Sequence, residues 1–154
     1  MATKKILFCT DFSENSVLAR RRAVEFAKAL GAQLNILHVV NASPLGYPIF
    51  EDRIPVDMAK LQEDIQSTVR QELQMVAQEC GRDLAKNVQA HFLVGQPAAE
   101  IVRFADEQSM DLIVMGTHGW TGFKHLILGS TAENVVRTAN CPVLTVRGTV
   151  RREG

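Results

Sequence analysis

Short apolar segments alternate with amphipathic segments along most of this chain, and this alternation restricts the possible folds more than any other feature. The apolar segments have the length and the flanking residues of buried strands. The amphipathic segments carry apolar residues every three or four positions, as do helices that pack on one side. The predicted strands cover residues 5–10, 34–40, 88–94, 111–115 and 142–147; the predicted helices cover residues 14–30 and 131–138, begin at Pro97, and begin at Val56 with an end or bend near Gly81.

Strands that alternate with helices in this way indicate a parallel sheet with helices on both faces. We therefore predict an α/β fold, a single-domain, Rossmann-like three-layer sandwich whose five-stranded parallel sheet has the order 3-2-1-4-5. Ligands of such sheets bind beyond the carboxyl ends of the strands, where the winding changes direction. Asp11 follows the first strand and Gly116 follows the fourth, so both residues are expected at one crevice.

The bulk composition argues against several classes of partner. Lys plus Arg and Asp plus Glu each number 17, so the net charge is zero, whereas nucleic-acid binding usually needs a basic face. No apolar run approaches the roughly 20 residues of a membrane span, and the apolar run near the N-terminus is too short for a signal peptide. The three cysteines lack CxxC spacing and are interpreted as small buried hydrophobes. We predict no nucleic-acid partner, no membrane partner and a cytoplasmic location.

Glycines and hydroxyl residues cluster after the fourth predicted strand, at Gly116, Gly119, Gly129, Ser130 and Thr131. A glycine lets the backbone approach a ligand closely and also permits a positive φ. Free N–H groups at a helix start, with the helix dipole behind them, favour phosphate. Turn glycines followed by a simple helix N-cap explain the same residues equally well, so local chemistry leaves both interpretations open.

Histidines are the other residues whose interpretation depends on the fold. His118 lies inside the glycine-rich segment and, with Lys124 and His125, would add positive charge there. His38 is interpreted as a strand residue in the core. His91 is interpreted as a solvent-facing residue of a half-buried strand.

The spacing Gly116-x2-Gly119-x9-Gly129-Ser130 is that of the ATP-binding signature G-2x-G-9x-G-(S/T) of the universal stress protein family. Four further segments look like that family's in the same order: Ile6-Leu-Phe-Cys-Thr-Asp-Phe-Ser13, Leu37-His-Val39, Gly95-Gln-Pro-Ala98 and Cys141-Pro-Val-Leu-Thr-Val146. The chain thus resembles the ATP-binding subgroup over roughly residues 3–147, which implies an adenine nucleotide alpha hydrolase-like fold. We expect one domain over residues 1–147 and a flexible C-terminal tail over residues 148–154.

The resemblance also implies a role for each matching residue. Asp11 matches an acidic position near the adenosine, Val39 matches a position whose backbone meets adenine, and Met115 matches a position beside the ribose. The pair Cys9-Thr10 departs from the Pro-Thr or Val-Ala often found before the aspartate, without preventing binding. The phosphate positions are matched by Gly119, Gly129, Ser130 and Thr131. The predicted nucleotide-binding set is Thr10, Asp11, Val39, Met115, Gly116, His118, Gly119, Gly129, Ser130 and Thr131.

The function that the resemblance implies is a stress-response regulator that binds ATP with Mg²⁺ and hydrolyses it weakly or not at all. Phosphate-loop motifs of the GxxxxGK[ST] and GxGxxG types are missing, and Asp11 is the single acid placed for the crevice and the single candidate metal ligand. The alternatives are a slow ATPase, a nucleotidyl transferase related by fold, and an interaction module with structural glycines. A phosphoacceptor domain fits poorly, because the third strand ends in Val94-Gly95 and the fifth in Arg147.

The last predicted strand would lie at an edge of the sheet, where free backbone groups invite pairing. The resemblance implies a homodimer through this strand, and the predicted dimer edge consists of Val143, Leu144, Thr145 and Val146. The long loop over residues 41–55 follows the second strand, so we expect it to close over the nucleotide, with Tyr47 or Phe50 covering the base. Regulatory protein partners are expected, but the sequence does not name them.

Overall fold

The computed structural model describes residues 2–41, 58–85, 87–118 and 128–147. In this part of the chain the predicted alternation is confirmed, with element bounds that differ from the predicted ones by a few residues. The strands are β1 (Lys5–Cys9), β2 (Gln33–Asn41), β3 (Val88–Gly95), β4 (Leu112–Gly116) and β5 (Val143–Val146), and the helices are α1 (Glu14–Leu30), α2 (Met58–Gly81), α3 (Pro97–Glu107) and α4 (Ser130–Thr138).

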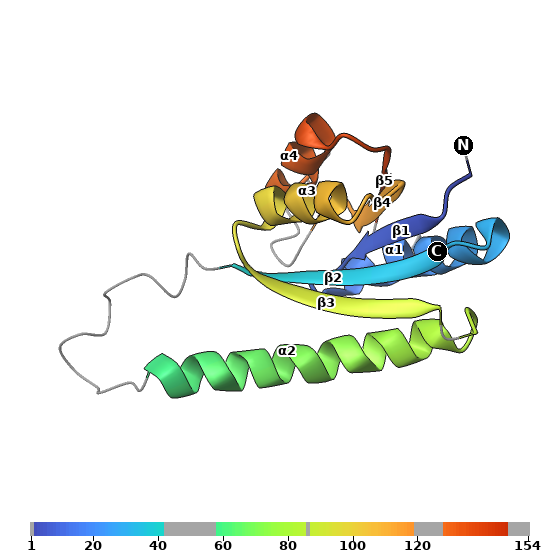
Figure 1. Cartoon of the computed structure of the whole chain (residues 1–154). Coiled ribbons are helices and arrows are strands. Elements are labelled where there is room, and N and C mark those ends of the chain that lie inside the picture. The colour runs from blue at the N-terminus through green and yellow to red at the C-terminus, as the bar shows by residue number, and fades with distance from the viewer. Residues whose placement is uncertain (1, 42–57, 86, 119–127, 148–154) are drawn as a thin grey trace, which may run out of the picture.

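All strand pairs are parallel, and the order β3-β2-β1-β4-β5 confirms the prediction. Cys9 at the end of β1 is level with Leu37 of β2 on one side and with Met115 of β4 on the other. The sheet therefore winds in both directions from β1, and the carboxyl ends of its three central strands meet at one edge (Figure 1).

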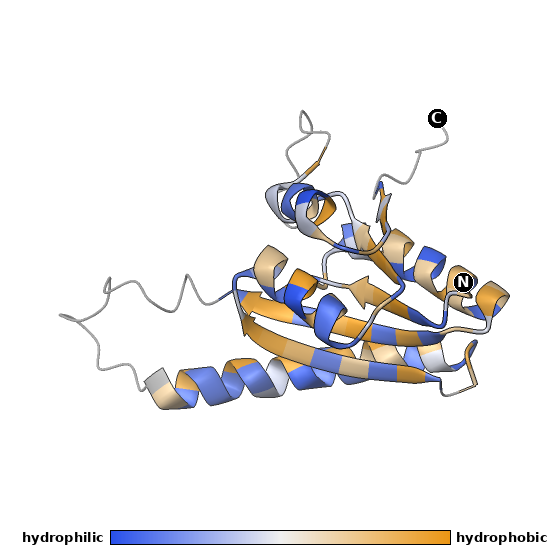
Figure 2. Ribbon diagram, turned by 45° about the horizontal axis from the view of Figure 1, so that its top comes forward, coloured by the Kyte–Doolittle hydropathy of each residue, from blue (hydrophilic) through white to orange (hydrophobic). Residues whose placement is uncertain are grey.

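Two apolar layers separate the sheet from its helices. Ile6 and Phe8 of β1 pack with α1 and α2 on one face, whereas Leu7 and Cys9 pack with α3 and α4 on the other. Because successive side chains of a strand point to opposite faces, a strand covered on both sides must be apolar throughout. The strands are accordingly largely apolar along their length, while the outer side of α2 is hydrophilic (Figure 2).

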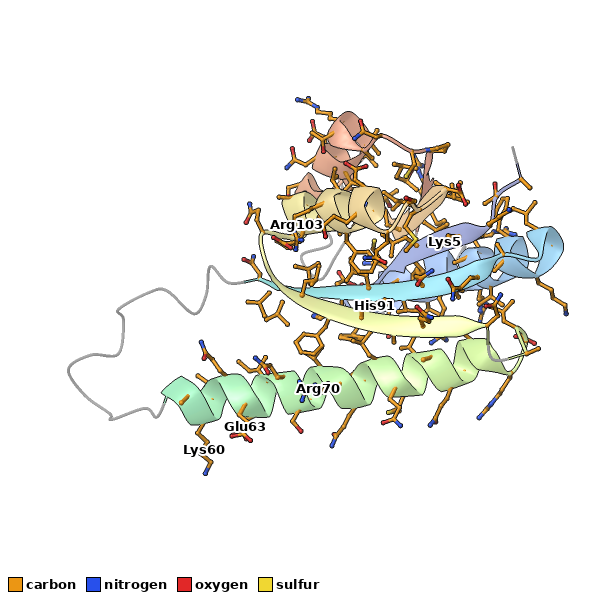
Figure 3. The ribbon with its side chains drawn as sticks, viewed as in Figure 1. Lys5, Lys60, Glu63, Arg70, His91 and Arg103 are labelled. Atoms are coloured by element: carbon orange, nitrogen blue, oxygen red, sulfur yellow. The ribbon has the colours of Figure 1, made fainter. Side chains whose placement is uncertain are left out.

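The long helix α2 packs along β3, as Figure 3 shows. The guanidinium carbon of Arg70 lies 5.3 Å from the centroid of the Phe92 ring, so a cation–π contact joins helix and strand. None of the helices in the described part of the chain combines the length and the apolar character that a membrane span requires.

Both ends of α1 lie where the sequence predicts them, but the N-cap residue lacks the usual capping hydrogen bond. Gly31 closes the helix in the left-handed conformation (φ 60°, ψ 31°), as a C-terminal glycine is expected to. Ser13 is the N-cap residue by backbone geometry, but its hydroxyl makes no capping bond. That hydroxyl donates a hydrogen bond to Asp11 Oδ1, and a carboxylate is a strong acceptor for such a bond.

Several predictions fall on residues outside the described part of the chain. These are the closing loop with Tyr47 and Phe50, the positions Gly119, Lys124 and His125 in the glycine-rich segment, and the C-terminal tail. They stay predictions.

Candidate functional site

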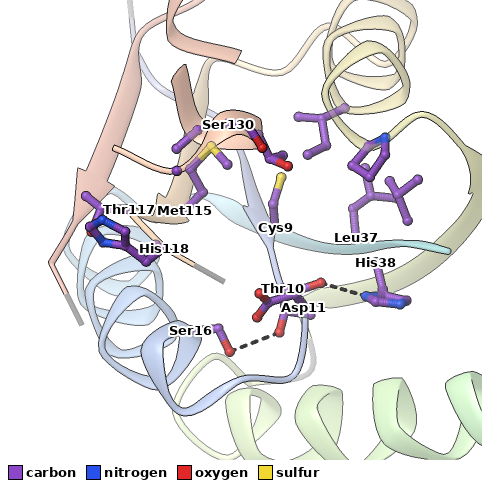
Figure 4. A pocket seen from close by; sticks show the side chains of 17 residues that line it. Cys9, Thr10, Asp11, Ser16, Leu37, His38, Met115, Thr117, His118 and Ser130 are labelled. Carbon is purple, nitrogen blue, oxygen red and sulfur yellow. Dashed lines mark hydrogen bonds between the residues drawn. The ribbon is translucent and has the colours of Figure 1, made fainter. Parts of the chain in front are cut away.

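A cavity of about 220 Å³ opens at the carboxyl edge of the sheet, between the ends of β1, β2 and β4 and the starts of α3 and α4 (Figure 4). Every described member of the predicted set lines it: Thr10, Asp11, Val39, Met115, Gly116, His118, Gly129, Ser130 and Thr131. Residues 11 and 116 therefore do share one crevice, as their strand positions predicted. We call this cavity the crevice.

A tight turn between β1 and α1 holds the acidic side of the crevice. Asp11 Oδ1 accepts hydrogen bonds from the Ser13 backbone N–H (2.9 Å) and the Ser13 hydroxyl (2.5 Å). Thr10 Oγ1 accepts a bond from the Phe12 N–H (3.0 Å), and the Thr10 N–H donates to the Leu37 carbonyl of β2 (3.0 Å). These bonds fix the Asp11 carboxylate at the crevice wall. We call residues 10–13 the Asp11 turn.

The two described glycines of the signature are required for space rather than for an unusual backbone conformation. A Cβ atom at Gly129 would lie 3.1 Å from the Thr117 carbonyl oxygen, and one at Gly116 would lie 3.3 Å from the Asn15 carbonyl oxygen. Gly129 has φ −69°, and neither glycine is among the described residues with positive φ. The expectation that these positions exploit positive φ is therefore wrong. Both glycines instead let two stretches of the protein's own backbone approach each other closely, and the expected close approach to a ligand stays a prediction.

Thr117 joins the strand end to the helix start. Its carbonyl accepts a hydrogen bond from the Gly129 N–H (2.6 Å), and its N–H donates to the Val146 carbonyl of β5 (3.0 Å). Its hydroxyl lies 2.9 Å from Nδ1 of His118, a second residue of the crevice wall. The sequence gives no sign of Thr117, because its contribution is made mainly by backbone groups that carry no residue-specific signal.

The start of α4 forms another wall of the crevice. Gly129 is the N-cap and has no side chain to satisfy the N–H groups of the first helical turn. The Gly129 carbonyl accepts the Glu133 N–H (2.9 Å), so the N–H groups of Ser130, Thr131 and Ala132 precede the first intrahelical bond. These groups and the helix dipole favour a negatively charged ligand. The Glu133 carboxylate in this turn pairs with Arg137 at 2.9 Å.

Among the described lining residues, the titratable groups assemble neither an activated nucleophile nor a metal cluster. Burial, and secondarily the nearby Cys141, raise the pKa of the Cys9 thiol far above its usual range, so Cys9 stays protonated. Asp11 is the one carboxylate among the described lining residues. The described ranges contain no group of three or more His, Cys, Asp or Glu side chains placed to hold a metal ion. Cys9 and Cys80 are buried as predicted, and Cys141 is half-buried.

The two strand histidines differ from their interpretation. His38 is half-buried at the crevice end of β2 rather than in the core, and its Nδ1 lies 2.8 Å from the Thr10 carbonyl oxygen. His91 is half-buried rather than solvent-facing, with its ring centroid 4.9 Å from that of Phe104 and Nε2 3.3 Å from Asn35 Oδ1. Alternation placed both residues on strands, but it did not reveal which neighbouring element covers them.

Fold and crevice together define a doubly wound α/β protein with a cavity at the switch point between β1 and β4, the place where ligands of such sheets bind. Residues 2–147 match the model of the Universal stress protein family. A universal stress protein of Methanocaldococcus jannaschii is 39% identical over 145 residues, which cover 94% of this chain and 82% of that relative. The chain belongs to the universal stress protein family.

Solved structures of relatives agree with the fold. The universal stress protein UspA from Lactobacillus plantarum matches with a TM-score of 0.82 and 26% identity, over 96% of this chain and 99% of that one. A universal stress protein crystallised in complex with cAMP matches with a TM-score of 0.71 and 26% identity, over 97% of this chain and 100% of that one.

Proposed function

We propose that this chain binds ATP in the crevice and acts as a nucleotide-dependent regulator of the stress response. The observation that carries the proposal is the placement of the open start of α4 opposite the Asp11 turn across one cavity. In an adenine nucleotide the ribose hydroxyls lie between the base and the anionic phosphates, so the ribose can meet the Asp11 turn while the phosphates meet the helix start. The complex of a family member with cAMP supports the same ligand class.

Each wall has a task in this proposal. The Asp11 carboxylate accepts hydrogen bonds from the ribose hydroxyls, and the backbone of Val39 pairs with the adenine edge. Met115 and Gly116 lie against the ribose, with the glycine allowing close approach. The phosphates meet the backbone N–H groups and hydroxyls of Ser130 and Thr131, with His118, Gly119 and Gly129 beside them.

Mg²⁺ fits this donor set as a companion of the phosphates. Mg²⁺ in nucleotide sites commonly takes most of its ligands from phosphate and water and one or two from the protein. Asp11 and the hydroxyls of Ser130 and Thr131 are oxygen donors of the required type. When bound, the ion would neutralise phosphate charge, while the chain itself supplies the helix start and the shape of the crevice.

We propose that turnover is weak or absent. Phosphoryl transfer needs metal ligands together with a group that orients the attacking water. Within the described lining, Asp11 would have to serve both roles. Nucleotide occupancy, rather than hydrolysis, would then be the signal passed to regulatory protein partners.

We further propose that the protein is a cytoplasmic homodimer that assembles through β5. In the described sheet β5 pairs with β4 on one side, so its other side is an edge. Val143, Leu144, Thr145 and Val146 are all half-buried within the single chain. A second copy would cover their remaining apolar surface and pair with the edge backbone groups.

Isothermal titration calorimetry with Mg²⁺ and ATP, ADP, AMP, cAMP or GTP tests the proposed function. We expect saturable binding of ATP, weaker binding of GTP, and a loss of about tenfold in affinity for Asp11→Ala, a change that removes a charge-assisted hydrogen-bond acceptor. Release of radiolabelled phosphate should stay near background. The absence of binding heat at millimolar nucleotide would favour the interaction module. Phosphate release clearly above background that Asp11→Asn abolishes would favour the slow ATPase.

A further inference from the structure

The Asp11 turn contains a backbone conformation that is unfavourable unless neighbouring contacts stabilise it. Phe12 has φ +62° in the left-handed region, which is disfavoured for a residue with a bulky side chain. Such conformations persist only where surrounding contacts over-determine them, and they gather at functional sites. Because Phe12 directly follows Asp11, the contact that fixes Phe12 also fixes the direction of the carboxylate.

His38 makes two contacts with this turn from the neighbouring strand β2. Its ring centroid lies 4.4 Å from that of Phe12, with 33° between the ring planes. Its Nδ1 lies 2.8 Å from the Thr10 carbonyl oxygen, the bond drawn as a dashed line in Figure 4. A carbonyl oxygen only accepts, so Nδ1 carries the proton and donates. The His38 side chain thus contacts the turn on both sides of Asp11, at the backbone carbonyl of Thr10 and at the ring of Phe12.

Helix α1 and the core also contact the turn, since Ser16 Oγ donates to the Ser13 carbonyl (2.7 Å) and Phe12 packs against the apolar cluster of α1 and α2. That packing is incomplete. A second cavity, of about 160 Å³, lies between α1 and α2 and borders Phe12 and Ser13. Its other wall is formed partly by the Arg20–Glu79 ion pair, at 2.6 Å, and by Met75, which is 57% exposed. The helices therefore leave space next to the Phe12 ring, and the contact with His38 limits its movement on the sheet side.

We infer that His38 is a positioning residue of the crevice, which orients Asp11 through Thr10 and Phe12. The inference rests on the proposed function, since the oriented carboxylate is the group that meets the ribose. His38 acts by holding the Asp11 turn, and its effect on nucleotide affinity is therefore carried by the Asp11 carboxylate.

A set of substitutions separates the two contacts. His38→Ala removes both, His38→Asn keeps a donor at the place of Nδ1, and His38→Phe keeps the ring against Phe12. His91→Gln is the matched control, because it changes a half-buried strand histidine that bonds Asn35 and does not line the crevice. A double-mutant cycle of His38→Ala with Asp11→Ala measures whether the two residues act through one another.

Calorimetry with Mg²⁺ and ATP gives the first readout. We expect His38→Ala to bind about tenfold more weakly, His38→Asn to recover most of that loss, and His91→Gln to bind as the wild type does. In the Asp11→Ala background, His38→Ala should cost nothing further. Wild-type affinity of His38→Ala, additive losses in the cycle, or an equal loss in His91→Gln would each overturn the inference.

Amide hydrogen exchange without nucleotide gives the second readout. The Phe12 and Ser13 N–H groups are bonded inside the turn, so His38→Ala should speed their exchange at least tenfold while amides of β4 stay unchanged. Unchanged exchange at Phe12 and Ser13 overturns the inference. If the exchange accelerates but the wild type binds no ATP, His38 holds the turn and the proposed function is the part that fails.

Discussion

Gly129 lies so close to the carbonyl of Thr117 that adding a single methyl group, in Gly129→Ala, should disturb the wall of the crevice. The Gly129 N–H donates to that carbonyl at 2.6 Å, and an added Cβ would lie 3.1 Å from the same oxygen. Gly129 has φ −69° and ψ 162°, a conformation open to every residue. Gly129→Ala therefore acts through this contact and not through backbone strain.

The magnitude follows from two opposing terms. Overpacking a fixed backbone contact costs about 1–3 kcal/mol, whereas replacing glycine by alanine recovers about 0.4–1 kcal/mol from the unfolded chain. We expect a net loss of stability of about 1 kcal/mol. The shifted start of α4 misdirects the N–H groups of Ser130 and Thr131, and weakening one charge-assisted bond costs about tenfold in ATP affinity.

The assay pairs calorimetry with urea unfolding, and Gly31→Ala is the matched control. Gly31 has φ +60° with nothing within 4 Å of its added Cβ, so alanine there costs about 1 kcal/mol of backbone strain alone. Both variants should lose similar stability, but Gly129→Ala alone should lose affinity. Equal ATP affinity in Gly129→Ala and the wild type would refute the assignment of this close approach to the phosphate side.

Two further predictions concern the edge strand and a buried histidine. The carbonyls of Pro142 and Val146 accept hydrogen bonds from β4 and from the residue after it. Because backbone groups alternate in direction along a strand, those of Thr145 point away from β4. Thr145→Pro should therefore convert the dimer to a monomer in light scattering while Thr145→Val should not, and a Thr145→Pro variant that stays dimeric would exclude this interface. Burial lowers the pKa of His91 below its usual 6.5, so the native state binds fewer protons than the unfolded state as pH falls below 6.5. In urea unfolding, the stability of the wild type should therefore fall more steeply between pH 7.5 and pH 5 than the stability of His91→Gln. Parallel stability curves for the two proteins would contradict the lowered pKa of His91.

The fold was predictable because its determinants are local and repeated. β1, β2 and β4 are largely apolar and mostly buried, whereas β3 and β5 are half-buried or exposed. Gly31 and Pro97 mark helix ends through backbone preferences that hold in any context. The right-handed connections left few strand orders, and 3-2-1-4-5 is a common one among doubly wound sheets of five strands. The family resemblance added the same conclusion independently.

The sequence predicted many of the residues that line the crevice, but it did not predict the contacts that fix their positions. Gly116 and Gly129 were identified by their spacing, yet the reason for glycine is a carbonyl of a distant element, which no periodicity records. His38 was misjudged because strand alternation reports burial and not the neighbour across the turn. Thr117 contributes largely through its backbone, so its sequence identity carries little signal.

Amide chemical-shift mapping during a titration with Mg²⁺ and ATP tests the central claim most directly. Bound nucleotide should shift the amides of Ser130, Thr131 and Ala132 most strongly, together with those of the Asp11 turn, at the two walls of one cavity. Amides of α1 and α2 along the second cavity should move little, apart from Ser16, which lines both cavities. Saturable shifts confined to α2, or no shift at millimolar ATP, would contradict the account.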